Sequence, residues 1–201
     1  FGAESAVLLH LIANIDPSIP VLFLDTGKHF PETITYREEL RAILGLLDLR
    51  ILTPDPALLR QKDETGLRWS YDPDGCCEMR KVLPLSAALA GFDAQFTGRK
   101  AFQSSTRRAL PRFEIEDGRL KVNPLADWDK DRIDAYMAEH ALPSHPLVEL
   151  GYPSIGCSPC TTKVAPGEDP RSGRWKGWDK VECGIHNAVK PIGDGSDDPI
   201  F

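Results

Sequence analysis

The chain has 201 residues, of which 41% are hydrophobic and 27% are charged, a composition typical of a globular protein that can bury a core. Its formal net charge of −6 argues against broad nucleic-acid binding, although a local basic pocket for an anion is compatible with that total. No apolar run approaches the roughly 20 residues of a membrane-spanning helix, and the N-terminus lacks the pattern of a secretory signal. We therefore expect a cytoplasmic protein with no membrane or nucleic-acid partner.

The first part of the chain alternates between helix and strand patterns. A loop at Gly2–Ser5 leads into an apolar helix, and the strand expected before such a loop is missing from the sequence. Short apolar runs predict strands over 21–24 and 49–52, with a helix over 31–44 between them. This alternation indicates an α/β architecture with buried parallel strands.

The pattern continues to about residue 140 and then changes. We expect a helix over 76–90, a strand over 94–97, a hairpin of 113–115 and 120–122 around Asp117-Gly118, and a helix that Asp127 or Asp129 caps and that runs to about His140. From Pro143 onward, proline and glycine recur with few periodic stretches, so loops are expected there.

Four of the five cysteines fall in two pairs. Cys76 and Cys77 are adjacent, and Cys157 and Cys160 form a CxxC motif. Thiolates are the usual ligands of iron-sulfur clusters and of structural zinc. Adjacent cysteines favour a four-iron cube over a single zinc ion, because the cube offers each sulfur a separate iron. The alternative is that the first pair is simply buried on a helix.

The fifth cysteine is a candidate nucleophile. Cys183 lies in the segment Glu182-Cys183-Gly184-Ile185-His186, too far beyond Cys160 to belong to the same local motif. A thiolate reacts readily with sulfur electrophiles, and cationic neighbours such as His186 favour that thiolate. Glu182 has the opposite effect, so an unreactive exposed cysteine remains an alternative.

Basic and glycine-containing segments supply candidate anion sites. Arg99 and Lys100 follow a predicted strand, and Arg171 and Arg174 precede the Cys183 segment. Guanidinium groups bind phosphate and sulfate oxygens, although charged loops are often only solvated surface. Gly2–Ser5 at a helix start could present backbone N–H groups to an anion, or be an ordinary helix cap.

Five segments together resemble, in order and over essentially the whole chain, the phosphoadenylyl-sulfate and adenylyl-sulfate reductase family. They are Phe1–Ser5, Leu24–Gly27, Cys76–Lys81, Gly156–Thr161 and Glu182–His186. The resemblance implies an adenine-nucleotide α-hydrolase-like (pyrophosphate-loop) fold, with a mainly parallel sheet flanked by helices. The family motif begins with a serine before the phenylalanine, so we expect the chain to be N-terminally incomplete.

The resemblance also implies roles for individual residues. Family members with both cysteine pairs carry one 4Fe-4S cluster per chain and generally prefer adenylyl sulfate as substrate. The expected cluster ligands are Cys76, Cys77, Cys157 and Cys160, and the expected catalytic residues are Cys183, Lys81 and His186. The expected substrate-binding residues are Gly2, Ala3, Glu4, Ser5, Asp25, Thr26, Gly27, Arg99, Gln103, Arg171 and Arg174.

The predicted activity is reduction of adenylyl sulfate to sulfite and AMP through an S-sulfocysteine on Cys183, in assimilatory sulfate reduction and cysteine biosynthesis. Thioredoxin or a glutaredoxin-like protein would be the reductant, and a homo-oligomer is compatible with the sequence. Residues 1–180 would bind nucleotide and cluster, and 181–201 would carry the catalytic cysteine. The alternatives are phosphoadenylyl-sulfate reductase activity, a pyrophosphate-loop tRNA-thiolating or adenylating enzyme, and a metal-stabilised binding module without activity.

Overall fold

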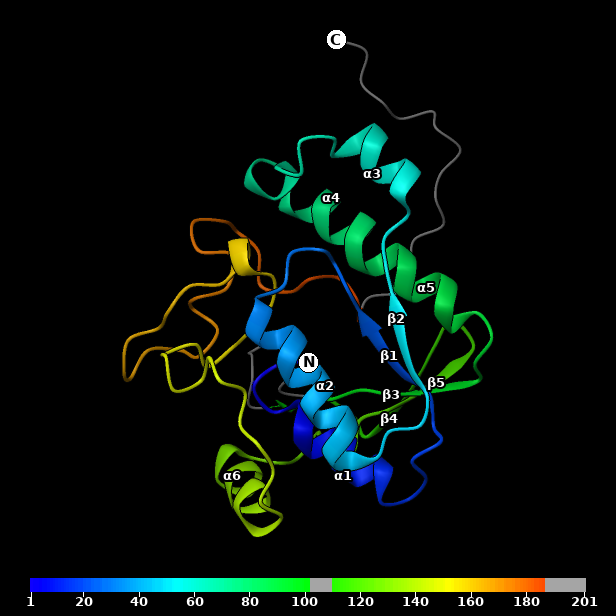
Figure 1. Ribbon diagram of the computed structural model, residues 1–201, viewed down its shortest axis with the longest axis vertical. Helices are drawn as coiled ribbons and strands as arrows, with labels where there is room; N and C mark the ends of the chain where they lie inside the picture. Colours follow the sequence, from blue (N-terminus) through cyan, green and yellow to red (C-terminus); the bar gives the residue numbers. More distant parts are fainter. Residues whose placement is uncertain (102–109, 187–201) are drawn as a thin grey trace.

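Helices and short strands alternate along the part of the chain that the computed structural model describes, residues 1–101 and 110–186 (Figure 1). The α-helices are α1 (Ser5–Ala13), α2 (Pro31–Leu44), α3 (Pro56–Lys62), α4 (Pro73–Cys77), α5 (Leu83–Leu89) and α6 (Lys130–Glu139). The strands are β1 (Val21–Leu24), β2 (Leu49–Leu52), β3 (Ala94–Phe96), β4 (Phe113–Glu116) and β5 (Arg119–Val122). Shorter turns are the 3₁₀ helices η1 (Arg68–Ser70) and η5 (Ser158–Cys160) and the π-helix η2 (Glu78–Val82). The predicted α/β class is confirmed.

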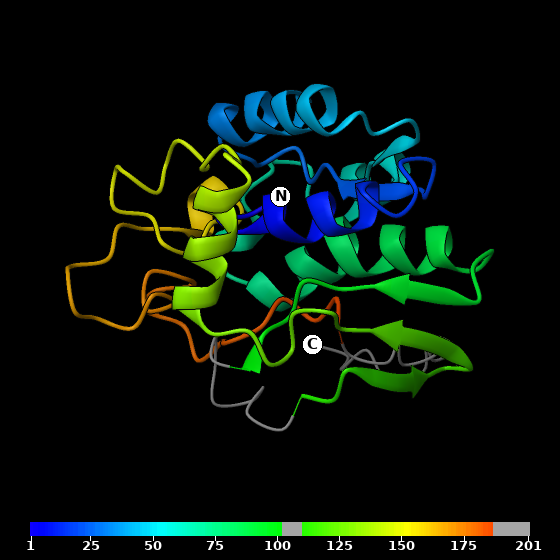
Figure 2. The ribbon, with the colours of Figure 1, turned by 90° about the horizontal axis from the view of Figure 1, so that it is seen from below.

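The strands form two small sheets. β1 and β2 pair in parallel, with Val21 opposite Leu49. In the second sheet β5 is central, parallel to β3 and antiparallel to β4. Asp117 and Gly118 both have positive φ, 51° and 74°, which is the conformation that a two-residue hairpin turn requires. In Figure 2, α5 is seen between the two sheets.

α2 has the predicted bounds, because both of its ends are specified by the sequence. Pro31 occupies the first turn, where its missing N–H costs nothing, and Gly45 ends the helix in the left-handed region at φ 62°. Thr33, Tyr36 and Leu40 lie on its buried face. Their helical spacing packs α2 against the core.

The main core lies where α1 contacts both α2 and α6. Its buried residues are Ala6, Val7, Leu9, Tyr36, Leu40, Leu46, Leu125, Ile133 and Leu142. The Asp129 carboxylate accepts a hydrogen bond from the Arg132 amide, so Asp129 rather than Asp127 is the cap of α6. The core therefore fixes α1, whose N-terminal end carries the Gly2–Ser5 loop.

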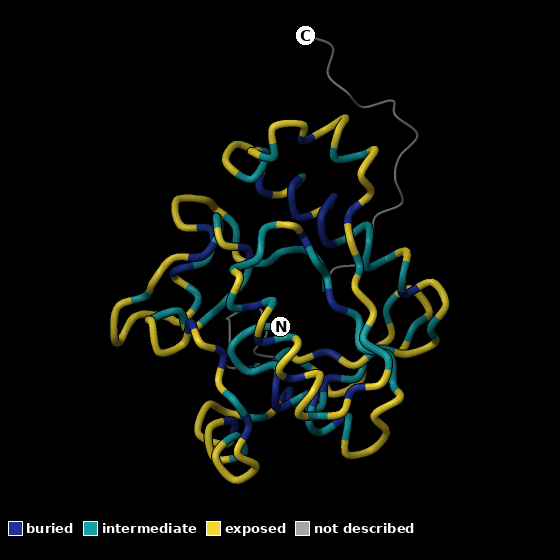
Figure 3. The backbone as a smooth tube through the Cα atoms, in the orientation of Figure 1, coloured by how far each residue is buried: buried dark blue, intermediate teal, exposed yellow. Residues whose placement is uncertain are grey.

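The single helix predicted over 76–90 is replaced by α4, η2 and α5, which follow one another without a break. The run begins at Pro73 because the Asp72 carboxylate caps the Gly75 amide. Its middle takes a wide π turn just before Pro84, which cannot donate the backbone hydrogen bond of a regular helix. Figure 3 shows α4 and η2 largely buried.

The remaining described residues from Pro143 are mostly loop, as predicted, apart from the single turn η5. In Figure 1 these loops lie to one side of α2 and α4. Within residues 1–101 and 110–186, no helix has both the length and the apolar character needed to cross a membrane.

Candidate functional site: two adjoining cavities

The two cysteine pairs line one small cavity. Cys76 and Cys77 come from α4, Cys157 precedes η5, and Cys160 is its last residue. Cys160 is half-buried, the other three cysteines are buried, and all four are free of disulfide bonds. The cavity is completed by Lys28, Trp69, Pro73, Arg80, Lys81 and Pro159. The fold thus brings together four thiols from two segments that are distant in sequence.

Hydrogen bonds fix the loop that carries Cys157. Thr26 Oγ1 lies 3.3 Å from Cys157 Sγ, and the Ser158 amide donates to the Lys28 carbonyl at 2.8 Å. Arg80 donates to the Thr26 carbonyl at 2.8 Å and pairs with Asp63 at 2.6 Å. The Arg80 and Asp63 side chains are only 8% and 0% exposed. The cysteine cavity therefore rests on a buried polar network.

Burial favours the neutral form of three of the thiols in this cavity. Burial, and then the neighbouring thiols, raise the pKa of Cys76 to about 11 and also raise the pKa of Cys77 and Cys160. Burial lowers the pKa of Lys81, but Cys157 and nearby thiols outweigh it, so the pKa is raised. Thiols of this kind become thiolates when a metal centre binds them.

The four thiols form a donor set that is compatible with a multi-iron cluster. Among the described residues, no three His, Cys, Asp or Glu side chains form a group that could hold a single metal ion. A cube contacts each thiolate through a separate iron, so its ligands need not converge on one point. Cys76, Cys77, Cys157 and Cys160 could hold such a cluster.

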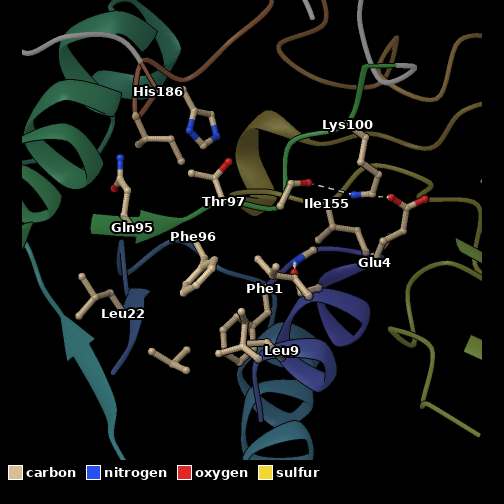
Figure 4. Close-up of a pocket in the computed structure, with 18 of the residues that line it drawn as sticks. Phe1, Glu4, Leu9, Leu22, Gln95, Phe96, Thr97, Lys100, Ile155 and His186 are labelled. Carbon is tan, nitrogen blue, oxygen red and sulfur yellow. Dashed lines mark hydrogen bonds and ion pairs between the residues drawn. The ribbon is translucent and has the colours of Figure 1, made fainter. Parts of the chain in front are cut away.

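A second cavity of about 660 Å³ adjoins this site and has a polar and an apolar end (Figure 4). In Figure 4, Glu4 and Lys100 lie at one end and Leu9, Leu22 and Phe96 at the other. Seven of the predicted site residues line it: Gly2, Ala3, Glu4, Ser5, Arg171, Arg174 and His186. Its polar end is built from cations and from the start of a helix, which together attract anions.

The Gly2–Ser5 loop lies at the N-terminus of α1. The Gly2 amide donates to Ser5 Oγ at 2.7 Å, which closes the loop. The Glu4 carboxylate pairs with the buried Lys100 ammonium at 2.9 Å. Lys100 also donates to the Gly98 carbonyl at 3.0 Å. The first amides of α1 therefore face a cavity that already contains a lysine.

Arg174 is a half-buried cation that lines the larger cavity. Its guanidinium lies 4.5 Å from the centre of the Trp175 ring, and its Nε has no hydrogen-bond partner. Among the described residues, no carboxylate forms an ion pair with Arg174. Burial, and then the neighbouring Arg171, lower its pKa. A half-buried guanidinium in this state is suited to an incoming anion.

Other predicted substrate residues lie elsewhere. Asp25, Thr26 and Gly27 do not line the larger cavity; the Asp25 carboxylate caps the Gly27 amide, and Thr26 contacts Cys157. Arg99 does not line it either, because its guanidinium pairs with Glu114 and donates to Thr97 and Asn123. Gln103 lies outside the described residues.

The Cys183 segment adjoins the larger cavity, which Ile185 and His186 line. The Cys183 thiol is half-buried, and it lies close enough to Lys81, Arg174 and Cys77 for its charge to act toward a higher pKa in each of these groups. Arg171 donates to the Val181 carbonyl at 2.7 Å and to Glu182 at 3.3 Å. The candidate nucleophile thus adjoins both the four thiols and the cationic end of the larger cavity.

Lys121, on β5, contacts the Cys183 segment, and the sequence did not reveal this contact. Its ammonium pairs with Glu116 and donates to the His186 carbonyl at 3.1 Å. Burial, and then the Arg99 guanidinium, lower the pKa of Lys121 to about 8. Strand alternation alone gives this lysine an ordinary polar position, so the signal is visible only in the folded chain.

The family model of the phosphoadenosine phosphosulfate reductase domain matches residues 1–163 of the chain. The chain belongs to the phosphoadenosine phosphosulfate reductase family. It is 55% identical to the adenosine 5'-phosphosulfate reductase of Mesorhizobium japonicum, over 92% of this chain and 73% of the relative. It is 51% identical to that of a Chelativorans species, over 92% of this chain and 76% of the relative. These matches extend beyond residue 163 toward the Cys183 segment.

Solved structures agree with the family assignment. A phosphoadenylyl-sulfate reductase from Candida auris, solved as a phosphate complex, superposes with a TM-score of 0.66 at 33% identity, over 82% of this chain and 80% of that chain. The FMN adenylyltransferase of Candida glabrata superposes with a TM-score of 0.57 at 18% identity, over 94% of this chain and 63% of that one. The second likeness concerns the fold alone, and it supports the expected adenine-nucleotide α-hydrolase-like architecture.

Proposed function

We propose that this family member reduces adenylyl sulfate to sulfite and AMP, with Cys183 as the nucleophile. The observation that carries the proposal is that His186 lines the larger cavity while the Cys183 thiol lies close to Arg174, Lys81 and Cys77. Relatives at 55% and 51% identity are named adenosine 5'-phosphosulfate reductases, which supports this substrate. The reaction would serve assimilatory sulfate reduction and cysteine biosynthesis.

The substrate anions would bind at the polar end of the larger cavity. The amides at the start of α1 suit one phosphate or sulfate group, because a helix N-terminus attracts negative charge. The half-buried Arg174 and the buried Lys81 supply cations close to Cys183. Arg171 can exchange its contact with Glu182 for a substrate oxygen.

The chemistry has three displacement steps. Cys183 thiolate attacks the sulfur of adenylyl sulfate; a new S–S bond forms, the bond from sulfur to the bridging oxygen breaks, and AMP leaves with that electron pair. The cations stabilise the negative charge that develops on the departing phosphate and on the sulfo oxygens. A thiolate of a dithiol protein such as thioredoxin then attacks Cys183 Sγ; a mixed disulfide forms and sulfite leaves with the electron pair of the S–S bond. The second thiolate of the reductant attacks the reductant sulfur of that mixed disulfide, closes the reductant's own disulfide, and releases Cys183 as a thiolate.

Cys76, Cys77, Cys157 and Cys160 would hold a 4Fe-4S cluster, for which the donor set and the shared cavity are suited. Bound there, the cluster would supply a fixed charged centre that links α4 to the η5 loop. Lys81 would bind beside it, with its ammonium near both Cys157 and Cys183. The displacement at Cys183 requires no change in the oxidation state of the iron.

The test follows the sulfo group. Wild-type protein given adenylyl sulfate without reductant should gain one sulfo group on the Cys183 peptide, detected by mass spectrometry, and reduced thioredoxin should remove it as sulfite. Cys183→Ser should form neither product and still bind AMP, because a serine hydroxyl is a far weaker nucleophile near neutral pH. Turnover by Cys183→Ser, or sulfo transfer to another residue, would contradict the mechanism. A parallel assay with the 3'-phosphorylated substrate tests the alternative reductase activity.

A further inference from the structure

We propose that Lys121 is a positioning residue for Cys183: its ammonium holds the Val181–His186 segment against the β3–β5–β4 sheet. The inference rests on the proposed function of Cys183 as the nucleophile. Lys121 lines neither of the two cavities, so it contacts neither the substrate site nor the thiol cavity. Its influence on the reaction would pass through the main chain of the segment.

The burial of Lys121 makes this contact specific. Lys121 is 1% exposed, although lysine is rarely buried to this extent without partners. Its ammonium uses the Glu116 carboxylate and the His186 carbonyl, at 3.1 Å, as acceptors. A buried ammonium strongly favours conformations in which its acceptors are present. The observed position of the His186 carbonyl is therefore favoured, because it accepts a hydrogen bond from the buried Lys121 ammonium.

Cys183 lies between two fixed points. On one side, Arg171 donates to the Val181 carbonyl at 2.7 Å; on the other, Lys121 holds the carbonyl of His186. Gly184 makes the turn between them at φ 84°, with Val82 Cγ2 at 3.4 Å from where a Cβ would lie. With both ends of the segment held, the Cys183 thiol can occupy only a small range of positions beside Lys81 and Arg174. Loss of either contact would increase that range.

The contact is made to a backbone carbonyl, so it sets the position of the segment whatever side chain stands at residue 186. The role is also distinct from general support of the sheet. Glu116, on the neighbouring strand, is the partner that links Lys121 to the hairpin itself. Substitution of Glu116 removes only the contact of Lys121 within the sheet, whereas removal of the Lys121 ammonium also removes its contact with the Cys183 segment.

The experiment measures how readily iodoacetamide alkylates Cys183 in the intact protein purified anaerobically, followed on the Cys183 peptide by mass spectrometry. Lys121→Met should raise this rate by about tenfold or more, as expected for loss of a hydrogen bond from a charged donor. Single-turnover formation of S-sulfocysteine at saturating adenylyl sulfate should slow by a similar factor, while AMP affinity changes less than about twofold. Iron content and β5 amide protection report whether the fold is retained.

Two further variants separate position from stability. Lys121→Gln is one bond shorter and should remain polar beside Glu116 without reaching His186, so it should release Cys183 even if Lys121→Met is unstable. Glu116→Gln keeps the ammonium and its contact with His186, so it should leave alkylation within about twofold of wild type. Equal release in Glu116→Gln, or wild-type alkylation in folded Lys121→Gln, would overturn the proposal. Failure of Cys183 as the nucleophile would appear separately, as turnover in Cys183→Ser.

Discussion

The four-thiol cavity and the Cys183 segment are fixed by different means. The cavity is formed by consecutive helical turns, three buried thiols and a buried ion pair. Residues 181–186 contain no helix or strand. Arg171 and Lys121 hold this segment through main-chain carbonyls, Arg171 also contacts the Glu182 side chain, and the preceding Lys180 pairs with the exposed Asp74 carboxylate. One region is a scaffold, and the other is attached at a few points.

This difference suits a reaction in two stages. A nucleophile that first meets a nucleotide and then a protein reductant has to change its surroundings between the stages, whereas a cluster-binding site does not. A few side-chain to main-chain hydrogen bonds can be exchanged more readily than a buried helical frame. We therefore predict that mutations in the four-thiol cavity will chiefly reduce cluster binding, and that mutations at the contacts of the Cys183 segment will chiefly change the reactivity of the Cys183 thiol.

The largest effect should follow from removing a thiol of the scaffold. Cys157→Ser should lose most of its iron and all measurable sulfite formation, because Cys157 is buried and its Sγ is held by Thr26. Iron and acid-labile sulfide analysis of anaerobically purified protein is the measurement. Cys183→Ser is the matched control and should keep its iron. Retention of about four irons by Cys157→Ser would remove Cys157 from the ligand set.

The next effect concerns the buried ion pair beneath the thiols. Asp63→Ala leaves Arg80 charged and buried, so it should reduce the free energy of unfolding by about 3–5 kcal/mol, measured by urea denaturation. The control is Glu38→Ala on the exposed face of α2, which should change it by at most about 1 kcal/mol. Cys183 alkylation should respond far less to Asp63→Ala than to Lys121→Gln. A stable Asp63→Ala protein would show that the pair is not part of the frame.

Gly156→Ala should act on the substrate site rather than on stability. A Cβ at Gly156 would lie 2.1 Å from an Arg174 guanidinium nitrogen, so the flexible end of Arg174 has to move. Loss of one charge-assisted contact to the substrate predicts a rise in KM for adenylyl sulfate of about tenfold or more. Gly91→Ala, which meets no atom within 4 Å, is the matched control. An unchanged KM would place the Arg174 contact outside the substrate site.

The sequence predicts most of the scaffold, because its signals are local. Pro31 begins α2 and Gly45 follows its last residue, so α2 has the expected bounds. Asp117-Gly118 marks the hairpin, although each of its strands is one residue longer than expected. Helix α3 was missed although Asp55 caps it, because none of its residues is buried and it shows no apolar stripe. The π turn was missed because the apolar spacing over 76–90 continues through it.

The candidate site was predicted less completely, because its contacts join segments that are distant in sequence. The four paired cysteines share one cavity, as their spacing suggested. Arg99 was expected at the substrate, yet a carboxylate from β4 draws it into the sheet. Lys121 was not singled out, since a lysine in a strand gives no sign of which distant carbonyl will cover it.

The smallest expected effect lies at the third attachment of the Cys183 segment, where Lys180 pairs with Asp74 on α4. The Asp74 side chain is 80% exposed, so water and salt screen the pair, and its contribution should be about 0–1 kcal/mol. Asp74→Asn should therefore raise Cys183 alkylation only slightly at low ionic strength, and the difference should vanish in 1 M salt, where the screening length is about 3 Å. The effect of Lys121→Gln should persist in that salt, because its contact is buried. The rate of Cys183 alkylation in both variants, measured at the two salt concentrations, decides which contact holds the Cys183 segment. If Asp74→Asn releases Cys183 as strongly as Lys121→Gln does, the segment is held from the α4 side, and the buried lysine serves the hairpin alone.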